Sequence, residues 1–349
     1  MKLQSYRGRR VFVTGHTGFK GSWLCKMLSD AGATVSGYSL DPPTNPNLYE
    51  LAKIDGLVES NICDIRDFST LKEKFDDFKP EIVFHLAAQP IVKDGYSEPR
   101  YTYETNVMGT VNILECIRES SSVKSFVNVT TDKVYLNREW AWGYRENEEL
   151  NGYDPYSNSK SCSELTTETY YRSFLKGKIA VSTARAGNVI GGGDFAPYRI
   201  IPDCVRSVIS GRPIEIRNPG STRPYQHVLE PLSAYLQIAD MQLEDNGICG
   251  SYNIGPDERE NVTTEEIVKS FGKHWGKDFR WITKEESSPV HEANHLRLDC
   301  SKIKSKIGWH PKWSADAAVE QVCEWNRVWL SGGDVGEEMS REIQLYFGD

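Results

Sequence analysis

Tyr156 and Lys160 lie four residues apart, directly after Asp154 and Pro155. Aspartate is favoured at the N-cap of a helix and proline at its first position, so we expect a helix to begin here. Residues four apart share one helix face, which would bring the Lys160 ammonium beside the Tyr156 phenol. A phenol ordinarily ionises at about pH 10, and a nearby positive charge favours its anion. Tyr156 could therefore accept a proton from a substrate hydroxyl.

Thr131, Asp132 and Lys133 follow an apolar run, residues 125–130, that reads as a strand. Open α/β sheets place ligands at the carboxyl ends of their strands, where the Thr131 hydroxyl could bond the same substrate oxygen as Tyr156. A simple dehydrogenase needs neither the acid nor the potential base beside it. Elimination of water next to a new ketone would use both, provided that burial or a like charge lowers the pKa of Lys133. The alternative is a solvated turn after a strand.

A site for a hydride acceptor is encoded near the N-terminus. Residues 10–14 read as a buried strand, followed by the loop Gly15-His-Thr-Gly-Phe-Lys-Gly21 and an apolar-periodic helix. Such a loop lets backbone approach a pyrophosphate at a helix N-terminus, although its spacing differs from the usual G-x-G-x-x-G. A second strand, residues 34–40, ends at Asp41, whose carboxylate would accept the ribose hydroxyls and repel a 2′-phosphate. We therefore expect NAD rather than NADP; the alternative is a plain strand-turn-helix with a surface aspartate.

Strands alternate with helices through the first half of the chain, which predicts an α/β fold with a Rossmann-type, doubly wound parallel sheet. After about Gly187 the pattern becomes irregular, which suggests a smaller, mixed α/β C-terminal substrate domain. Further strands are expected at residues 81–85, 125–130 and 178–183, and helices at residues 99–119, 228–243, 263–275 and 315–329. We expect residues 1–187, with 226–254 packing back on them, to bind NAD, and residues 188–225 and 255–349 to bind the substrate.

Two of these helices carry apolar stripes. The stripe of the earlier helix is Val107, Val111, Leu114 and Ile117. That of the later one is Val319, Val322, Trp325 and Trp329. The helical spacing of the second stripe favours a face turned to the core rather than a cofactor site.

The composition is ordinary for a globular protein, with 349 residues, 26% of them charged. A net charge of −8 argues against nucleic acid as the main partner. No apolar run approaches the ~20 residues of a membrane span, and no secretory signal is recognisable. The eight cysteines include no C-x-x-C pair and read as reduced thiols. These features predict a cytoplasmic protein without a membrane partner.

Several motifs, in order along the chain, resemble the extended short-chain dehydrogenase/reductase superfamily of nucleotide-sugar enzymes. They are Val13-Thr-Gly-His-Thr-Gly-Phe-Lys-Gly21, Asn61-Ile-Cys-Asp64, His85-Leu-Ala-Ala-Gln89, Thr131, Tyr156-x-x-x-Lys160, Arg185-Ala-Gly-Asn188, and Arg297-Leu-Asp-Cys-Ser-Lys302 with Gly308-Trp-His-Pro311. The glycine loop, Leu-Ala-Ala-Gln-Pro and Thr-Thr-Asp-Lys-Val-Tyr resemble the CDP-glucose 4,6-dehydratase family in particular. Related sugar dehydratases usually carry Asp-Glu where this chain has Asp132 and Lys133. They more often have an arginine and a serine within residues 92–96, which leaves the contacts of Lys93 and Asp94 open.

The resemblance implies an NAD-dependent lyase of deoxysugar biosynthesis. It would oxidise C4 of the glucose of CDP-glucose, eliminate water across C5 and C6, and return the hydride to C6. Tyr156 would be the base at the C4 hydroxyl, supported by Lys160 and assisted by Thr131. Asp132 would be the acid at C6 and Lys133 the base at C5.

The resemblance also implies binding residues and an assembly. Cofactor-binding residues would be Gly15, Thr17, Gly18, Phe19, Lys20, Gly21, Asp41, Asp64, Ile65, Leu86, Ala87, Ala88, Gln89, Asn106, Thr130, Tyr156 and Lys160. Substrate-binding residues would be Asn188, Arg199, Arg217, Arg223 and Glu292. A homodimer would form through the helices containing Val107 and Tyr156, or the chain would form a homotetramer. The arginines could bind diphosphate or stack on a base, and their spacing does not show which.

Three other interpretations remain. An NAD-dependent nucleotide-sugar 4-epimerase would share everything except Asp132 and Lys133, and a dehydratase could act on another nucleotide sugar. A dinucleotide-sensing regulator on the same fold would not need Tyr156 and Lys160. His291-Glu-Ala-Asn-His295 matches the zinc pattern H-E-x-x-H, but its surroundings look extended, so no metal is expected.

Overall fold

The computed structural model describes residues 3–216, 218–257, 262–276, 279–283 and 296–348. Its centre is a seven-stranded sheet with the strand order β11-β6-β5-β4-β1-β2-β3. Every neighbouring pair in it is parallel. The strands are β1 (Arg10–Thr14), β2 (Thr34–Ser39), β3 (Glu59–Ile62), β4 (Ile82–His85), β5 (Ser125–Val129), β6 (Ala180–Ala186) and β11 (Gly250–Ile254). The predicted Rossmann-type parallel sheet is confirmed.

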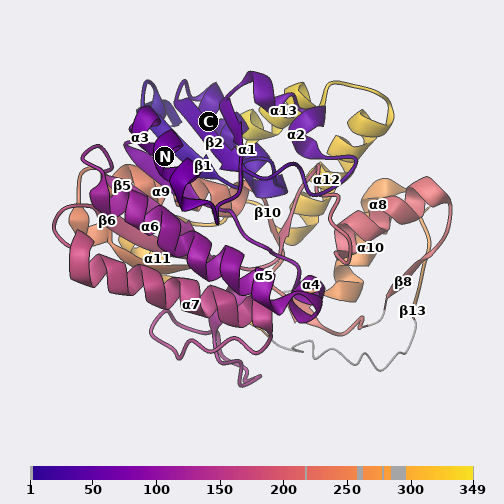
Figure 1. Ribbon diagram of the computed structural model, residues 1–349. Coiled ribbons are helices and arrows are strands. Elements are labelled where there is room, and N and C mark those ends of the chain that lie inside the picture. The colour runs from indigo at the N-terminus through magenta and orange to yellow at the C-terminus, as the bar shows by residue number, and fades with distance from the viewer. Residues whose placement is uncertain (1–2, 217, 258–261, 277–278, 284–295, 349) are drawn as a thin grey trace.

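Helices cover both faces of this sheet (Figure 1). The inner strands are buried along almost their whole length, which is why they read as apolar runs rather than as alternating patterns. One face packs on α3 (Phe68–Phe78), α6 (Gly109–Glu119) and α7 (Pro155–Tyr170). The other packs on α1 (Phe19–Asp30), α9 (Leu229–Gln242), α11 (Ser301–Ile307) and α13 (Val335–Phe347).

The helix expected at residues 99–119 is interrupted. It consists of α5 (Pro99–Tyr103), a π-helical turn (Glu104–Met108) and α6. A π-turn adds a residue to the turn and rotates the following face relative to a regular helix. Accordingly, Val107 and Val111 are only half-buried, whereas Asn106 and Thr110 are buried. The first half of the expected apolar stripe was therefore wrong, while Leu114 and Ile117 are in the core.

The later part of the chain builds a second core. Its helices are α8 (Ile200–Ser210), α10 (Thr264–Trp275) and α12 (Ala315–Leu330). Its strand pairs are β7 (Val189–Ile190) with β10 (Gln226–His227), β8 (Ile214–Ile216) with β13 (Trp281–Thr283), and β9 (Thr222–Arg223) with β12 (Val262–Thr263). Val319 and Val322 are fully buried there, and Trp325 is fully buried in the core of the first half. Trp329 is partly buried against both, so the expected core stripe is confirmed.

The contacts between the two halves cut across the domain limits expected from the sequence. β11 pairs with β6, and α9 contacts β5 and β6, so residues 226–254 do pack on the first half. However, α11 contacts β11 and α13 contacts α1, although both helices lie in the range expected to bind the substrate. The final helix, α13, therefore packs on the first half of the chain.

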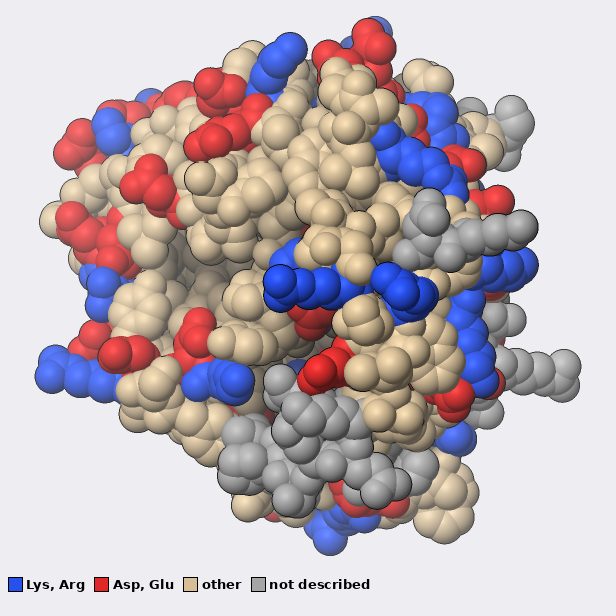
Figure 2. Space-filling model, turned by 90° about the vertical axis from the view of Figure 1, so that its right-hand side faces the viewer, with Lys and Arg blue, Asp and Glu red and all other residues tan. Residues whose placement is uncertain are grey.

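Short elements complete the described structure. They are α2 (Leu48–Leu51), α4 (Val92–Ser97), a π-turn (Tyr171–Leu175) and the 3-10 turns η1 (Leu3–Tyr6), η2 (Ile54–Gly56), η4 (Asp132–Val134) and η6 (Asn246–Ile248). Within the described part of the chain, no helix combines the length and apolar character of a membrane span. Figure 2 shows basic and acidic side chains interspersed on the face drawn there, without a large area of one sign.

Candidate active site

The helix that carries Tyr156 begins as the sequence predicts. The Asp154 side chain accepts a hydrogen bond from the Ser157 backbone at 3.0 Å, and Pro155 is the first helical residue of α7. Tyr156 and Lys160 are both buried on the sheet side of this helix. The Lys160 Nζ donates to the Val129 carbonyl, 3.2 Å away at the end of β5. The pair therefore faces the carboxyl edge of the sheet, as expected.

Thr131 and Asp132 stand at that same edge, just after β5. The Thr131 hydroxyl donates to Asp132 Oδ1 at 2.9 Å, and the Tyr156 phenol also hydrogen-bonds with Thr131. Asp132 is only 1% exposed, and its Oδ2 has no hydrogen-bond partner among the described residues. Burial raises the pKa of Asp132, opposed by the charge of Lys133. A buried carboxyl group that resists ionisation is suited to donate a proton.

Burial dominates the electrostatics of the predicted Tyr-Lys pair. It raises the pKa of Tyr156 to about 12, and the strongest opposing influences are Thr131 and Arg199. Burial also lowers the pKa of Lys160 to about 8, opposed by the charge of Glu164. The expectation that Lys160 would supply the main stabilisation of the Tyr156 anion does not hold in this structure, because the amine is directed to the Val129 carbonyl.

Three more cations converge on these residues from other elements. Arg199, just before α8, pairs with Asp194 at 2.8 Å, and its charge acts on Tyr156. Arg223 of β9 acts on Asp132. Lys20, near the start of α1, lies close enough to Lys160 and Arg199 that burial and these charges lower its pKa to about 7. This concentration of positive charge is suited to an anionic substrate such as a diphosphate.

The glycine loop fits a dinucleotide. Gly15 has φ +77°, and a Cβ there would meet the Ala87 backbone nitrogen at 2.8 Å. A Cβ on Gly21 would lie 2.0 Å from the Gly15 carbonyl oxygen, so the loop requires glycine where it packs on α1. Gly18 is the N-cap of α1 and makes no side-chain cap, which leaves the backbone N–H groups of Phe19 and the following residues directed out of the helix. Such a cradle suits a pyrophosphate.

The residues after β4 and β2 frame the rest of the expected cofactor site. The backbone nitrogens of Leu86 and Ala87 both donate to Thr14 Oγ1 at 3.1 Å. The Thr17 hydroxyl donates to the Leu40 carbonyl at 2.8 Å, which ties the glycine loop to the segment before Asp41. Asp41 itself is exposed and two residues beyond β2. This is the end of the strand next to β1, where the ribose carboxylate was expected.

Gln89 and Asn106 connect the expected cofactor site to α7, the helix that carries Tyr156. Asn106, in the π-turn, accepts from the Gln89 backbone at 2.8 Å and donates to the Ser159 hydroxyl at 2.9 Å. The Gln89 side chain donates to Thr102 at 2.9 Å. Both polar side chains are thus occupied within the chain and position the loop that includes Ala88.

Two other expected cofactor residues, Asp64 and Ile65, lie beyond β3. The Asp64 carboxylate pairs with Arg66 at 2.7 Å, and this hydrogen bond lowers its pKa. Ile65 is buried against Gly109, whose added Cβ would meet it at 2.8 Å. Ile65 could therefore present only its edge to an adenine.

Of the remaining substrate residues, Asn188 lies between β6 and β7. Its backbone carbonyl accepts from the Gln226 nitrogen at 3.0 Å, and its side chain hydrogen-bonds with Tyr225. Arg217 and Glu292 lie outside the described residues, as does the H-E-x-x-H segment His291 to His295. His85, by contrast, is a satisfied core residue, since its ring nitrogens contact Thr14 and Thr110 at 2.7 and 3.2 Å.

The sequence-based assignment missed Glu164, which continues the face of α7 that carries Tyr156 and Lys160. Glu164 is 2% exposed and forms a buried ion pair with Arg185 at 2.8 Å. The signal was available, because Tyr156, Lys160 and Glu164 repeat at intervals of four residues on one helix face.

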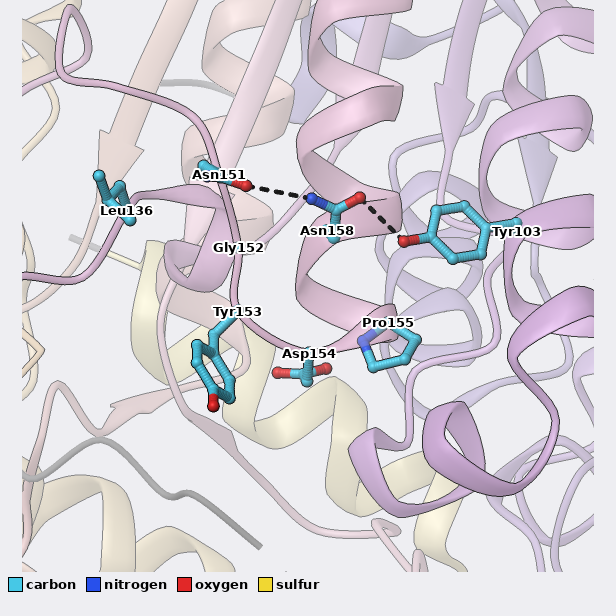
Figure 3. A pocket seen from close by; sticks show the side chains of 8 residues that line it. All are labelled: Tyr103, Leu136, Asn151, Gly152, Tyr153, Asp154, Pro155 and Asn158. Carbon is cyan, nitrogen blue, oxygen red and sulfur yellow. Dashed lines mark hydrogen bonds between the residues drawn. The ribbon is translucent and has the colours of Figure 1, made fainter.

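A shallow depression of about 470 Å³ opens at the N-terminal end of α7 (Figure 3). Asn158 accepts from the Tyr103 hydroxyl at 2.9 Å and donates to the Asn151 side chain at 3.4 Å. The residues that line the depression are Tyr103, Leu136, Asn151, Gly152, Tyr153, Asp154, Pro155 and Asn158. Because none of the groups expected to do chemistry lines it, this depression is not the candidate active site.

Comparison with known proteins agrees with this geometry. Residues 12–322 match the family model described as GDP-mannose 4,6 dehydratase. The chain is 48% identical to the CDP-glucose 4,6-dehydratase of Salmonella typhimurium, over 98% of this chain and 97% of the relative.

Solved structures give the same picture of the fold. UDP-glucose 4-epimerase of Thermotoga maritima with UDP-glucose superposes with a TM-score of 0.80 at 25% identity, covering 92% of this chain and 99% of the other. dTDP-glucose 4,6-dehydratase of Bacillus anthracis in complex with NAD gives 0.75 at 23% identity, with 92% and 97% coverage.

Proposed function

The chain belongs to the GDP-mannose 4,6-dehydratase family of the extended short-chain dehydrogenases/reductases, and we propose that it converts CDP-glucose into CDP-4-dehydro-6-deoxyglucose with loss of one water. The protein is an NAD-dependent hydro-lyase. When bound, NAD would supply the hydride-transfer chemistry at C4 and C6. Gly15, Gly18 and Gly21 would cradle its pyrophosphate, and Asp41 its adenosine ribose.

Tyr156 and Thr131 would act at the C4 hydroxyl. Both lie at the carboxyl end of β5 and hydrogen-bond to each other, so one substrate oxygen can contact both. Because burial holds the phenol protonated, the neighbouring cations must stabilise its anion as it accepts the proton. Arg199, whose charge lowers the pKa of Tyr156, would do so, and Lys160 would hold the nicotinamide ribose.

The observation that carries dehydration, rather than epimerisation, is the state of Asp132. A 4-epimerase has no leaving hydroxyl to protonate and no need of a buried acid. Here Asp132 is buried beside Thr131, with one oxygen left without a partner among the described residues and with a raised pKa. It would protonate the departing C6 hydroxyl while Lys133, the next residue and only half-buried, removes the C5 proton.

Cations outside the proposed catalytic residues would bind the substrate. Arg199 and Arg223 would bind the diphosphate from the second half of the chain. Arg217, Asn188 and Glu292 complete the proposed substrate set. The cytidine base rests on the close resemblance to the Salmonella enzyme.

We also propose a homodimer or homotetramer in the cytoplasm. Apolar side chains are exposed on the helices expected to form the dimer contact. Met108, in the π-turn before α6, is 50% exposed, and Leu165 of α7 is 49% exposed. All eight cysteines are free thiols, as a reducing compartment favours. Light scattering on the purified protein distinguishes the two assemblies.

The function is tested with a panel of CDP-, UDP-, dTDP- and GDP-glucose, followed by mass spectrometry. Loss of one water with retention of the nucleotide is expected, with CDP-glucose the best substrate. A product of unchanged mass would instead indicate an epimerase. The variant Lys133→Met should accumulate enzyme-bound reduced cofactor in rapid-mixing absorbance, because elimination is blocked after oxidation. Full turnover without that phase would remove Lys133 as the base.

A further inference from the structure

We propose that Glu164 is a positioning residue of this reaction, which holds Lys160 in its charged state and fixes the strand end that carries Thr131. The inference rests on the proposed function, since it concerns the same catalytic helix. It assigns a role to a side chain that touches neither the reacting atoms nor, by its position, a bound nucleotide sugar.

Both Glu164 oxygens are fully engaged. Oε1 accepts from the Thr130 hydroxyl at 2.5 Å. Oε2 accepts from the Thr183 hydroxyl at 2.6 Å and from Arg185 Nη2 at 2.8 Å. Thr130 is the residue directly before Thr131, so Glu164 joins α7 to the end of β5 as well as to β6. The distance between Tyr156 on α7 and Thr131 after β5 therefore depends on this carboxylate.

Arg185 is in turn fixed from its other side. Its Nη1 donates to the Tyr135 hydroxyl at 2.8 Å and to the Glu146 carbonyl at 3.0 Å. The Glu164 and Arg185 side chains are 2% and 3% exposed. An ion pair removed so completely from water has a high desolvation cost, which only several hydrogen bonds of good geometry offset.

The charges around Lys160 show why a carboxylate is needed there. On its own helix Lys160 faces Tyr156 and Glu164. From β4 it faces His85, which burial and the Lys160 charge keep neutral with a pKa of about 3. From α1 it faces Lys20, whose pKa is lowered to about 7 by burial and by the charges of Lys160 and Arg199, so it supplies no negative charge. Glu164 is thus the negative group that counteracts the loss of hydration at Lys160, whose pKa is already lowered to about 8.

Loss of this carboxylate should therefore move the deprotonation of Lys160 to lower pH. Activity that requires the ammonium is lost as the pH rises through the pKa of Lys160, which gives the alkaline limb of the pH profile of kcat/KM. In Glu164→Gln this limb should shift toward acid by about one pH unit or more, as expected when an adjacent opposite charge is removed. A purely structural role would lower the rate without moving the limb.

The experiment compares wild type, Glu164→Gln and Thr183→Val, each with NAD and CDP-glucose across pH. Thr183→Val is the matched control, because it removes one hydrogen bond to the same carboxylate without changing any charge, and its limb should stay at the wild-type pH. If Glu164→Gln fails to fold because Arg185 is left unpaired, the double variant Glu164→Gln/Arg185→Met is used, since no buried charge then lacks a partner. Because it also removes the Arg185 charge, its limb is compared with that of Arg185→Met and should lie at lower pH.

An alkaline limb at the wild-type pH in the folded Glu164→Gln enzyme, or at the Arg185→Met pH in the double variant, overturns the proposal. So does an equal shift in Thr183→Val. Failure of the proposed function is distinguishable, because wild-type enzyme would then give no dehydrated product at any pH.

Discussion

Glu164 and Glu342 are two of the almost completely buried carboxylates among the described residues, and their surroundings have opposite effects on them. Glu164 lies on α7, where three donors surround it: the Thr130 hydroxyl, the Thr183 hydroxyl and the Arg185 guanidinium. Glu342 lies on α13, where neither oxygen has a hydrogen-bond partner among the described residues. The group closest to Glu342 is the His227 ring, with 3.3 Å between His227 Nε2 and Glu342 Oε2.

The environment decides whether each site keeps its charge. Burial favours the neutral form of both acids, but the charge of Arg185 and the hydrogen bonds outweigh it at Glu164, whose pKa is lowered. At Glu342 burial raises the pKa well above its ordinary value, and burial lowers the pKa of His227 to about 3. The close approach of His227 and Glu342 is therefore between a neutral ring and a protonated acid, not an ion pair.

The two regions also have different duties. The Glu164 cluster lies at the carboxyl edge of the sheet, beside the groups that act on substrate. The residues around Glu342, which include His227, join the final helix α13 to α1 and α9. The His227 ring lies between the rings of Trp23 and Trp313. Glu164 keeps its charge where donors surround it, and Glu342 keeps its proton where neither oxygen has a hydrogen-bond partner among the described residues.

The largest effect is expected from Arg185→Met, which leaves Glu164 charged and buried without its partner. Removing one member of a buried ion pair costs about 3–5 kcal/mol of unfolding free energy. Urea unfolding monitored by circular dichroism measures this loss. A loss of less than about 1 kcal/mol would mean that Glu164 takes up a proton as readily as Glu342.

Tyr156→Phe tests the functional side of the same helix face. The ring still packs, but the proton acceptor is gone, so kcat should fall by about 10²-fold or more while stability changes little. Steady-state kinetics with CDP-glucose, together with the unfolding curve, check both parts. An unchanged kcat would remove Tyr156 from the mechanism.

A smaller effect is expected from Tyr346→Phe, in the cluster that Tyr346 of α13 forms with Glu230 of α9. The Tyr346 hydroxyl donates to the buried Glu230 at 2.6 Å, and its loss leaves that oxygen without its donor. Destabilisation of about 1–3 kcal/mol should follow, with kcat unchanged because the site is remote from the catalytic residues. Reduced activity in the folded variant would show that this cluster is coupled to the active site.

Glu342→Gln should change stability in the opposite direction, by an amount that is small near pH 5 and grows as the pH rises. The pKa of Glu342 is raised on folding, so its contribution to stability is fully present below about pH 4.5 and declines as the pH rises through the raised folded value. An amide has no such dependence. The variant should therefore gain stability relative to wild type between pH 5 and pH 8, by about 1.4 kcal/mol per pH unit at most. Thermal unfolding across that range measures the difference; parallel curves would place an ionised Glu342 in the fold.

Much of the site could be predicted from local patterns. The Asp154-Pro155 start of α7, the strand-loop-helix around Gly15 and the strand ending at Thr131 are each specified by neighbouring residues. The parallel sheet then brings them to one edge. The interrupted helix at residues 99–119 could not be predicted this way, because its π-turn follows from the hydrogen bonds of Asn106 to Gln89 and Ser159, which lie on other elements.

The sequence by itself therefore determined the sheet, the cofactor loop and the residue types at the catalytic edge, since backbone conformation and strand ends depend on short-range preferences. Only the tertiary structure decided the charge states. Asp132, Glu164 and Glu342 carry carboxyl groups that ionise at similar pH in water. Their different pKa values arise because burial, and the donors that distant strands and helices do or do not supply, set the free energy of each charge.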